Sequence, residues 1–198
     1  MEQIIENLKP FTKISKGRMQ NLLNLCKKAN ENNVLGAFVE CGVHKGGASV
    51  LMALNSEDRV TWMFDSFEGM PPPTDEDGPK APDWTGKTAA IEQYLKSLLW
   101  DYEIPKNKVR IVKGWFKDTI PKANLGQIAI LRLDGDWYES TKVCLENLYD
   151  KVSFGGYIII DDYGHWEGCR KAVDEFIEKR GLNVELHKTD YTERWWQK

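Results

Sequence analysis

Acidic side chains follow two strand-like apolar runs of this 198-residue chain. Asp134 and Asp136 follow the first run, and Asp161 and Asp162 follow the second. Carboxylates at neighbouring strand ends bring several oxygen donors to one edge of a sheet, a set that suits a hard cation such as Mg²⁺, or Mn²⁺. Either pair alone is explained equally well as loop-capping acids. Together they predict a metal site.

A glycine-rich turn follows an earlier apolar run. It places Glu40 before Gly42, Gly46 and Gly47, and Asp65 ends the next strand-like run. The turn lacks the GxGxxG spacing of a dinucleotide site, and a carboxylate before the first glycine would repel a phosphate. Glu40 can instead accept a hydrogen bond from an ammonium or hydroxyl group, and Asp65 is placed for ribose hydroxyls. This pattern favours S-adenosylmethionine; a tight turn with a capping acid is the plainer alternative.

Strand-like and helix-like runs alternate along the chain. This alternation predicts an α/β fold, a mostly parallel sheet with helices on both faces, in a single domain of residues 1–198. The expected parallel strands are 36–41, 60–64, 109–113, 128–133 and 156–160. A terminal hairpin at 184–188 and 193–197 adds an antiparallel edge. The expected helices are 16–30, 47–54, 88–99, 140–149 and 168–180.

Two segments lie outside this alternation. Residues 69–83 contain five prolines and four acids, so they form neither a helix nor a central strand, and we expect a lid-like loop over the substrate. Residues 1–30 are expected to be a helical N-terminal segment. Its first apolar side chains either cover the sheet or bury against a second copy in a homo-oligomer: Ile4, Ile5, Leu8 and Phe11.

Composition narrows the function classes. The formal net charge is −3, and no basic face of a nucleic-acid binder is evident. The longest apolar runs are strand-sized, so no membrane span is expected, and the first residues lack a secretory signal pattern. Four cysteines without CxxC spacing indicate buried thiols, which suits a cytoplasmic protein.

Five strings between residues 36 and 180 resemble the macrocin O-methyltransferase family. They are VECGV with the two following glycines (39–47), FDSFEGMP (64–71), GWFKDTIP (114–121), RLDGDWYEST (132–141) and GGYIIIDDY (155–163). The resemblance implies a Rossmann-like class I methyltransferase sheet of seven strands, the last one antiparallel. It also implies methylation of a hydroxyl on a sugar, or on a related small-molecule or polysaccharide acceptor, with S-adenosylmethionine and a divalent cation.

The resemblance carries roles to individual positions. It implies that Asp134, Asp161 and Asp162 hold the cation and that Asp136 is the general base. The positions expected to contact the cofactor are Glu40, Gly42, Val43, Gly46, Asp65, Ser66 and Trp115.

Two further side chains near the acids have more than one interpretation. His165 either assists as a base, lines the acceptor pocket, or is a surface loop histidine. Arg132 lies between strand leucines and is expected to pair with a buried carboxylate.

Two other functions are compatible with a nucleoside-binding sheet. A nucleotide-dependent oxidoreductase would share the fold, but the missing GxGxxG argues against it. A non-catalytic module that binds S-adenosylmethionine would keep the glycine-rich turn without turnover. A metal-dependent O-methyltransferase is the leading hypothesis.

Overall fold

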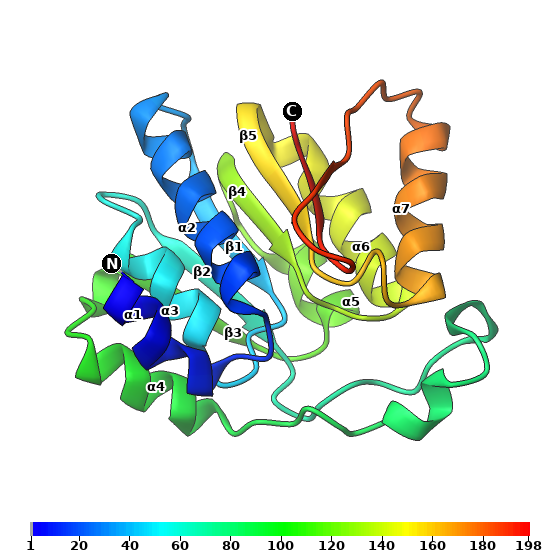
Figure 1. Cartoon of the computed structure of the whole chain (residues 1–198), viewed down its shortest axis with the longest axis horizontal. Coiled ribbons are helices and arrows are strands. Elements are labelled where there is room, and N and C mark those ends of the chain that lie inside the picture. Colours follow the sequence, from blue (N-terminus) through cyan, green and yellow to red (C-terminus); the bar gives the residue numbers. More distant parts are fainter. Residues whose placement is uncertain (1) are drawn as a thin grey trace.

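The computed structural model describes residues 2–198, and Met1, the first residue of the expected domain and helical segment, lies outside them. Across the described residues, seven strands form one sheet in the order β3-β2-β1-β4-β5-β7-β6 (Figure 1). Strands β1 to β5 pair in parallel, and β7 runs antiparallel between β5 and β6. The expected seven-stranded α/β arrangement is therefore confirmed. The strands are β1 (Ala37–Cys41), β2 (Thr61–Asp65), β3 (Val109–Lys113), β4 (Ile128–Leu133), β5 (Val152–Ile160), β6 (His187–Lys188) and β7 (Arg194–Gln197).

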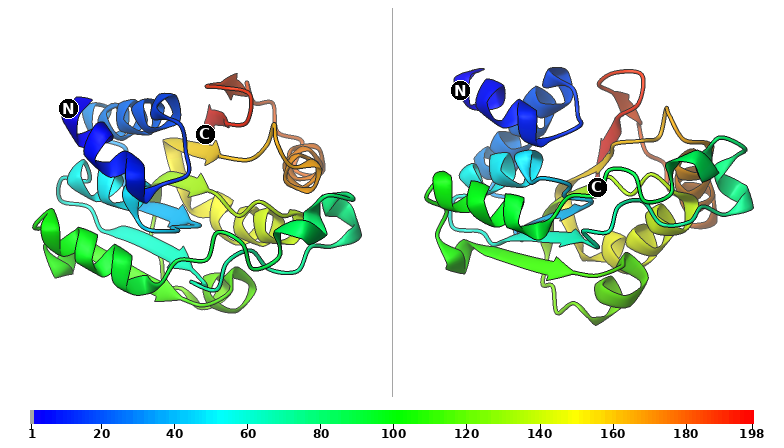
Figure 2. Two further views of the ribbon diagram at one scale, coloured as in Figure 1. Left: turned by 60° about the horizontal axis from the view of Figure 1, so that its bottom comes forward. Right: turned by 90° about the horizontal axis from the view of Figure 1, so that it is seen from below.

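Helices cover both faces of this sheet (Figure 2). Buried side chains of α1 to α4 form one apolar cluster with one face of the strands, and those of α6 and α7 form a second cluster with the other face. In β5, Tyr157 and Ile159 belong to the first cluster and Ile158 and Ile160 to the second, as the two-residue repeat of a strand requires. The helices are α1 (Glu2–Leu8), α2 (Lys16–Glu31), α3 (Gly47–Leu54), α4 (Glu92–Asp101), α5 (Phe116–Thr119), α6 (Tyr138–Leu148) and α7 (Glu167–Lys179).

The apolar side chains near the N-terminus pack within the chain itself. Ile5 and Leu8 of α1 are buried in the cluster that α2 and α3 share, while Ile4 and Phe11 pack against it. Helix α2 begins at the residue after Ser15, whose hydroxyl caps it by accepting a hydrogen bond from the Arg18 backbone N–H at 3.2 Å. This segment therefore covers the sheet, as one of the two expectations held. No helix among residues 2–198 is long and apolar enough to cross a membrane.

The structure departs from the expected elements in several places. Strand β5 begins at Val152 rather than at Gly156, and β6 covers only His187–Lys188 of the expected 184–188. Helix α4 begins at Glu92 rather than at Thr88, because Thr88 adopts a left-handed backbone conformation (φ 62°) that a right-handed helix cannot include. Helix α5 was not among the expected helices, because a single turn is too short to show an amphipathic pattern. Within the expected lid, Asp75–Asp77 forms a short 3₁₀ turn, and a second one follows at Ala81–Trp84.

A close approach between backbones fixes the turn after β1. Gly42 has φ +99°, and a Cβ atom there would overlap the carbonyl oxygen of Asp134 at the end of β4. The Asp134 backbone N–H in turn donates to the carbonyl of Cys41 at 2.8 Å. The absence of a side chain at Gly42 thus lets the glycine-rich turn lie against the first acidic strand end.

We expect Gly42→Ala to lower the free energy of unfolding by about 1–3 kcal/mol, because the added methyl group must displace backbone. Gly126→Ala is the matched control, since a Cβ there meets open space and the backbone is not left-handed. Urea titration of both variants measures the difference. Equal stabilities would contradict the close approach.

Candidate active site

A pocket of about 960 Å³ lies over the edge of the sheet where β1, β2, β4 and β5 end. All but one of the expected site residues line this pocket: Glu40, Gly42, Val43, Asp65, Ser66, Trp115, Asp134, Asp136, Asp161, Asp162 and His165. The exception is Gly46, which lies against Leu95 of α4.

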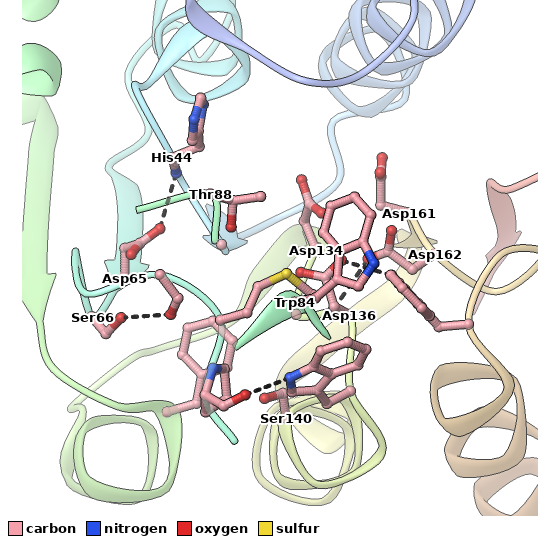
Figure 3. Close-up of a pocket in the computed structure, with 18 of the residues that line it drawn as sticks. His44, Asp65, Ser66, Trp84, Thr88, Asp134, Asp136, Ser140, Asp161 and Asp162 are labelled. Carbon is pink, nitrogen blue, oxygen red and sulfur yellow. Dashed lines mark hydrogen bonds between the residues drawn. The ribbon is translucent and has the colours of Figure 1, made fainter. Parts of the chain in front are cut away.

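Three carboxylates converge in this pocket (Figure 3). Asp134, Asp136 and Asp162 each offer an oxygen, and these atoms lie within 4.8 Å of one another. The convergence follows from the sheet, because β4 and β5 are paired with Leu133 opposite Ile160. An all-oxygen donor set of this size fits a hard divalent cation.

Burial and mutual repulsion disfavour the charged form of two of these carboxylates. Burial raises the pKa of Asp136 well above its usual value, and the charge of Asp134 raises it further, against the opposing effect of the Trp166 N–H donor. Burial likewise raises the pKa of Asp162, with Asp136 and Asp134 adding to the rise. A proton or a bound cation relieves this repulsion.

Asp161 lies beside this triad rather than within it. Its Oδ1 accepts from Arg132 Nη2 at 2.6 Å, and its Oδ2 pairs with Arg18 Nη1 from α2. Burial raises the pKa of Asp161 to about 7, although both arginines act in the opposite direction. Of the three residues expected to hold a cation, the structure therefore brings Asp134 and Asp162 together and engages the third with arginines.

Arg132 is the centre of a buried ion network. Its guanidinium, about 1% exposed, contacts Glu40 at 2.7 Å, Asp134 at 3.0 Å and Asp161 at 2.6 Å. The expectation that Arg132 pairs with a buried carboxylate is confirmed. Glu40 also accepts from the Ser49 hydroxyl, and burial raises the pKa of Glu40 to about 7. In this structure the Glu40 carboxylate is thus engaged by the protein.

Asp65 shapes the glycine-rich turn from the end of β2. Its Oδ2 accepts from the backbone N–H of His44 at 2.9 Å (Figure 3). The same oxygen accepts from the backbone N–H of Val43 at 2.7 Å, and Oδ1 accepts from the backbone N–H of Phe67 at 2.7 Å. Ser66 beside it accepts from the backbone of Glu68 at 3.1 Å. The expected ribose contacts of Asp65 remain a prediction. Its hydrogen bonds here fix the backbone of the turn beside the pocket.

An aromatic wall closes the pocket on the side of the proline-rich segment. Trp137 donates its indole N–H to the carbonyl of Pro71 at 2.8 Å, which fixes that segment to the start of α6. Trp166 packs edge-to-face on Trp137 and on Trp84, with ring centroids 4.8 Å and 5.7 Å apart. His165 packs against Trp166 and hydrogen bonds with the Tyr191 hydroxyl through Nδ1 at 3.1 Å.

Some pocket residues carry no signal that sequence reasoning could use. Arg18 lies on the polar face of an amphipathic helix and would be interpreted as a solvated charge. Trp84 lies just beyond the expected lid, where no periodicity marks its direction, yet both side chains line the pocket.

Comparison with known proteins shows the family of this chain. The profile of the macrocin-O-methyltransferase (TylF) family matches residues 8–198. The chain belongs to the macrocin O-methyltransferase family. It is therefore an S-adenosylmethionine-dependent O-methyltransferase.

Individual members show how much of the chain the likeness covers. This methyltransferase is 39% identical to demethyldecarbamoylnovobiocin O-methyltransferase of Streptomyces niveus, over 94% of the chain and 75% of the relative. It is 35% identical to 8-demethyl-8-(2,3-dimethoxy-alpha-L-rhamnosyl)-tetracenomycin-C 4'-O-methyltransferase of Streptomyces olivaceus, over 94% of the chain and 75% of that relative. The solved structure of the O-methyltransferase NovP superposes with a TM-score of 0.87 at 39% identity, covering 94% of this chain and 81% of that one.

The pKa of Glu40 leads to a pH prediction for the methyltransferase without cofactor or cation. Because the folded value is about 7 and the ordinary value 4.5, the folded protein retains a proton that the unfolded chain loses. The contribution of Glu40 to stability is therefore complete below pH 4.5 and is lost as the pH rises through 7. Urea unfolding between these values should show a smaller decline for Glu40→Gln than for the wild type; parallel curves would rule out the raised pKa.

Proposed function

We propose that this chain transfers a methyl group from S-adenosylmethionine to a hydroxyl of a sugar, or of a related small-molecule or polysaccharide acceptor, in a reaction that requires Mg²⁺ or Mn²⁺. The convergence of Asp134, Asp136 and Asp162 beside the glycine-rich turn carries this proposal. Family membership supports the methyl transfer. The Streptomyces olivaceus relative, whose name includes a rhamnosyl group, supports a sugar acceptor.

The cofactor and the acceptor are assigned to different parts of the pocket. Gly42, Val43 and Asp65 form one side with Ser66 and Trp115, an acid-lined turn that suits a ligand with an ammonium group and a ribose. Residues 69–83, Trp84 and His165 belong to the acceptor side in this proposal. A volume of about 960 Å³ is at the upper end of the usual range for small-molecule sites, which leaves room for two ligands.

The ligands of the cation are assigned from the resemblance and the geometry together. Asp134, Asp161 and Asp162 would hold it, with Asp161 released from one of its arginines. A divalent cation bound there would lower the pKa of an acceptor hydroxyl and fix its oxygen towards the sulfonium methyl group.

Asp136 is assigned as the general base. Trp166 Nε1 donates to its Oδ1 at 3.0 Å, which orients the carboxylate and leaves Oδ2 without a hydrogen bond among the described residues. The backbone N–H of Asp136 also donates to Asp162 Oδ2 at 3.3 Å, which keeps the base beside the proposed ligands. Oδ2 of Asp136 is then placed to accept the hydroxyl proton.

Removal of divalent cations tests the cation requirement. With labelled S-adenosylmethionine and a panel of glycosides, methyl transfer to an accepted glycoside should disappear in EDTA and return when Mg²⁺ or Mn²⁺ is added in excess. Calorimetry should show that S-adenosylmethionine still binds in EDTA. Transfer that continues at an unchanged rate in EDTA would refute the requirement.

Substitution of the base tests the role of Asp136. We expect Asp136→Asn to lower kcat by about 10²–10⁴-fold, because the amide cannot accept the proton, while affinity for S-adenosylmethionine stays unchanged. Asp58→Asn is the control, since this exposed carboxylate pairs only with Lys108 among the described residues. An Asp136→Asn variant with wild-type kcat would remove the residue from the mechanism.

A further inference from the structure

Arg18 reaches the acidic site from the first turn of α2. Its Nη1 pairs with Asp161 Oδ2, and its Nε lies 3.2 Å from Asp190 Oδ2 in the loop before β7. The side chain is mostly buried, with 13% of its surface exposed, and it lines the pocket. The positively charged guanidinium of Arg18 therefore lies next to the place where a metal cation is proposed to bind.

The two arginines leave Asp161 without a free oxygen. Arg132 holds Oδ1 and Arg18 holds Oδ2, which explains why Asp161 lies outside the carboxylate triad. A cation bound to Asp161 would share this carboxylate with two guanidinium groups, and the repulsion between these positive charges favours release of one arginine.

The structure distinguishes the arginine that can leave from the one that cannot. Arg132 is fully buried, and leaving Asp161 would disturb its contacts with Glu40 and Asp134. Arg18 faces the pocket, and Asp190, which is 29% exposed, is already within reach of its guanidinium. Moving Arg18 therefore costs less than moving Arg132, because its charge keeps a partner and gains water.

We propose that Arg18 is a positioning residue that competes with the divalent cation for Oδ2 of Asp161. Without the cation, the guanidinium neutralises Asp161 and holds it away from the triad. When the cation binds, Arg18 shifts to Asp190 and Asp161 completes the ligand set. This inference rests on the proposed function, since it requires a cation at this site.

The test measures the affinity of the cofactor-free protein for Mn²⁺ alone. The electron paramagnetic resonance signal of free Mn²⁺ reports how much of the ion is bound. Arg18→Gln removes the competitor and should tighten Mn²⁺ binding about tenfold, the effect of one nearby charge. A merely structural role would instead weaken binding. Arg18→Lys keeps the charge and should stay near the wild-type affinity.

Two further variants separate competition from a general change of charge. Lys13→Gln removes a positive charge from the same pocket, and it should change the affinity less than Arg18→Gln does. Asp161→Asn should weaken Mn²⁺ binding, and in that background Arg18→Gln should no longer tighten it. Circular dichroism verifies that each variant is folded.

The possible results are distinguishable. If the wild type binds Mn²⁺ and Arg18→Gln leaves that affinity unchanged or weakens it, the role of Arg18 is overturned while the proposed function stands. Unchanged affinity in Asp161→Asn would do the same, because Asp161 would then not be a ligand. No Mn²⁺ binding by any of the proteins would overturn the cation requirement of the proposed function, and this inference with it.

Discussion

One buried guanidinium joins the strand ends on which the active site is built. Arg132 of β4 binds Glu40 of β1, Asp134 at its own strand end and Asp161 after β5. A buried charge is tolerated only when hydrogen-bonding partners stay close to it, so these four side chains constrain one another. The glycine-rich turn and the acidic cluster are consequently parts of a single electrostatic unit, so a change of charge in one alters the other.

Much of this arrangement could be predicted from local sequence. Continuous apolar runs located five parallel strands to within a few residues, and the strand order of a doubly wound sheet placed the two acidic ends side by side. The turn after β1 was evident from its glycines. These features depend on periodicity and on short-range backbone chemistry, which a single sequence displays directly.

The partners of the acids could not be predicted in the same way. Arg18 and Asp161 are separated by 143 positions, and nothing in the helix pattern distinguishes Arg18 from a solvated surface charge. Glu40 was expected to face a ligand, and nothing in the sequence indicated that its carboxylate also binds Arg132 and Ser49. Such pairings are decided by tertiary packing. They change the electrostatics of the site without changing the fold.

The position of β7 has a consequence for how the chain is made. Because β7 is inserted between β5 and β6, the hydrogen-bonding edge of β5 stays uncovered until residues 194–197 have left the ribosome. That edge belongs to one of the most apolar strands, so it can pair with other chains for as long as β7 is absent. The loop directly before β7 also supplies Tyr191 and Thr192 to the pocket. Closure of the sheet and completion of the pocket therefore depend on the same segment of the chain.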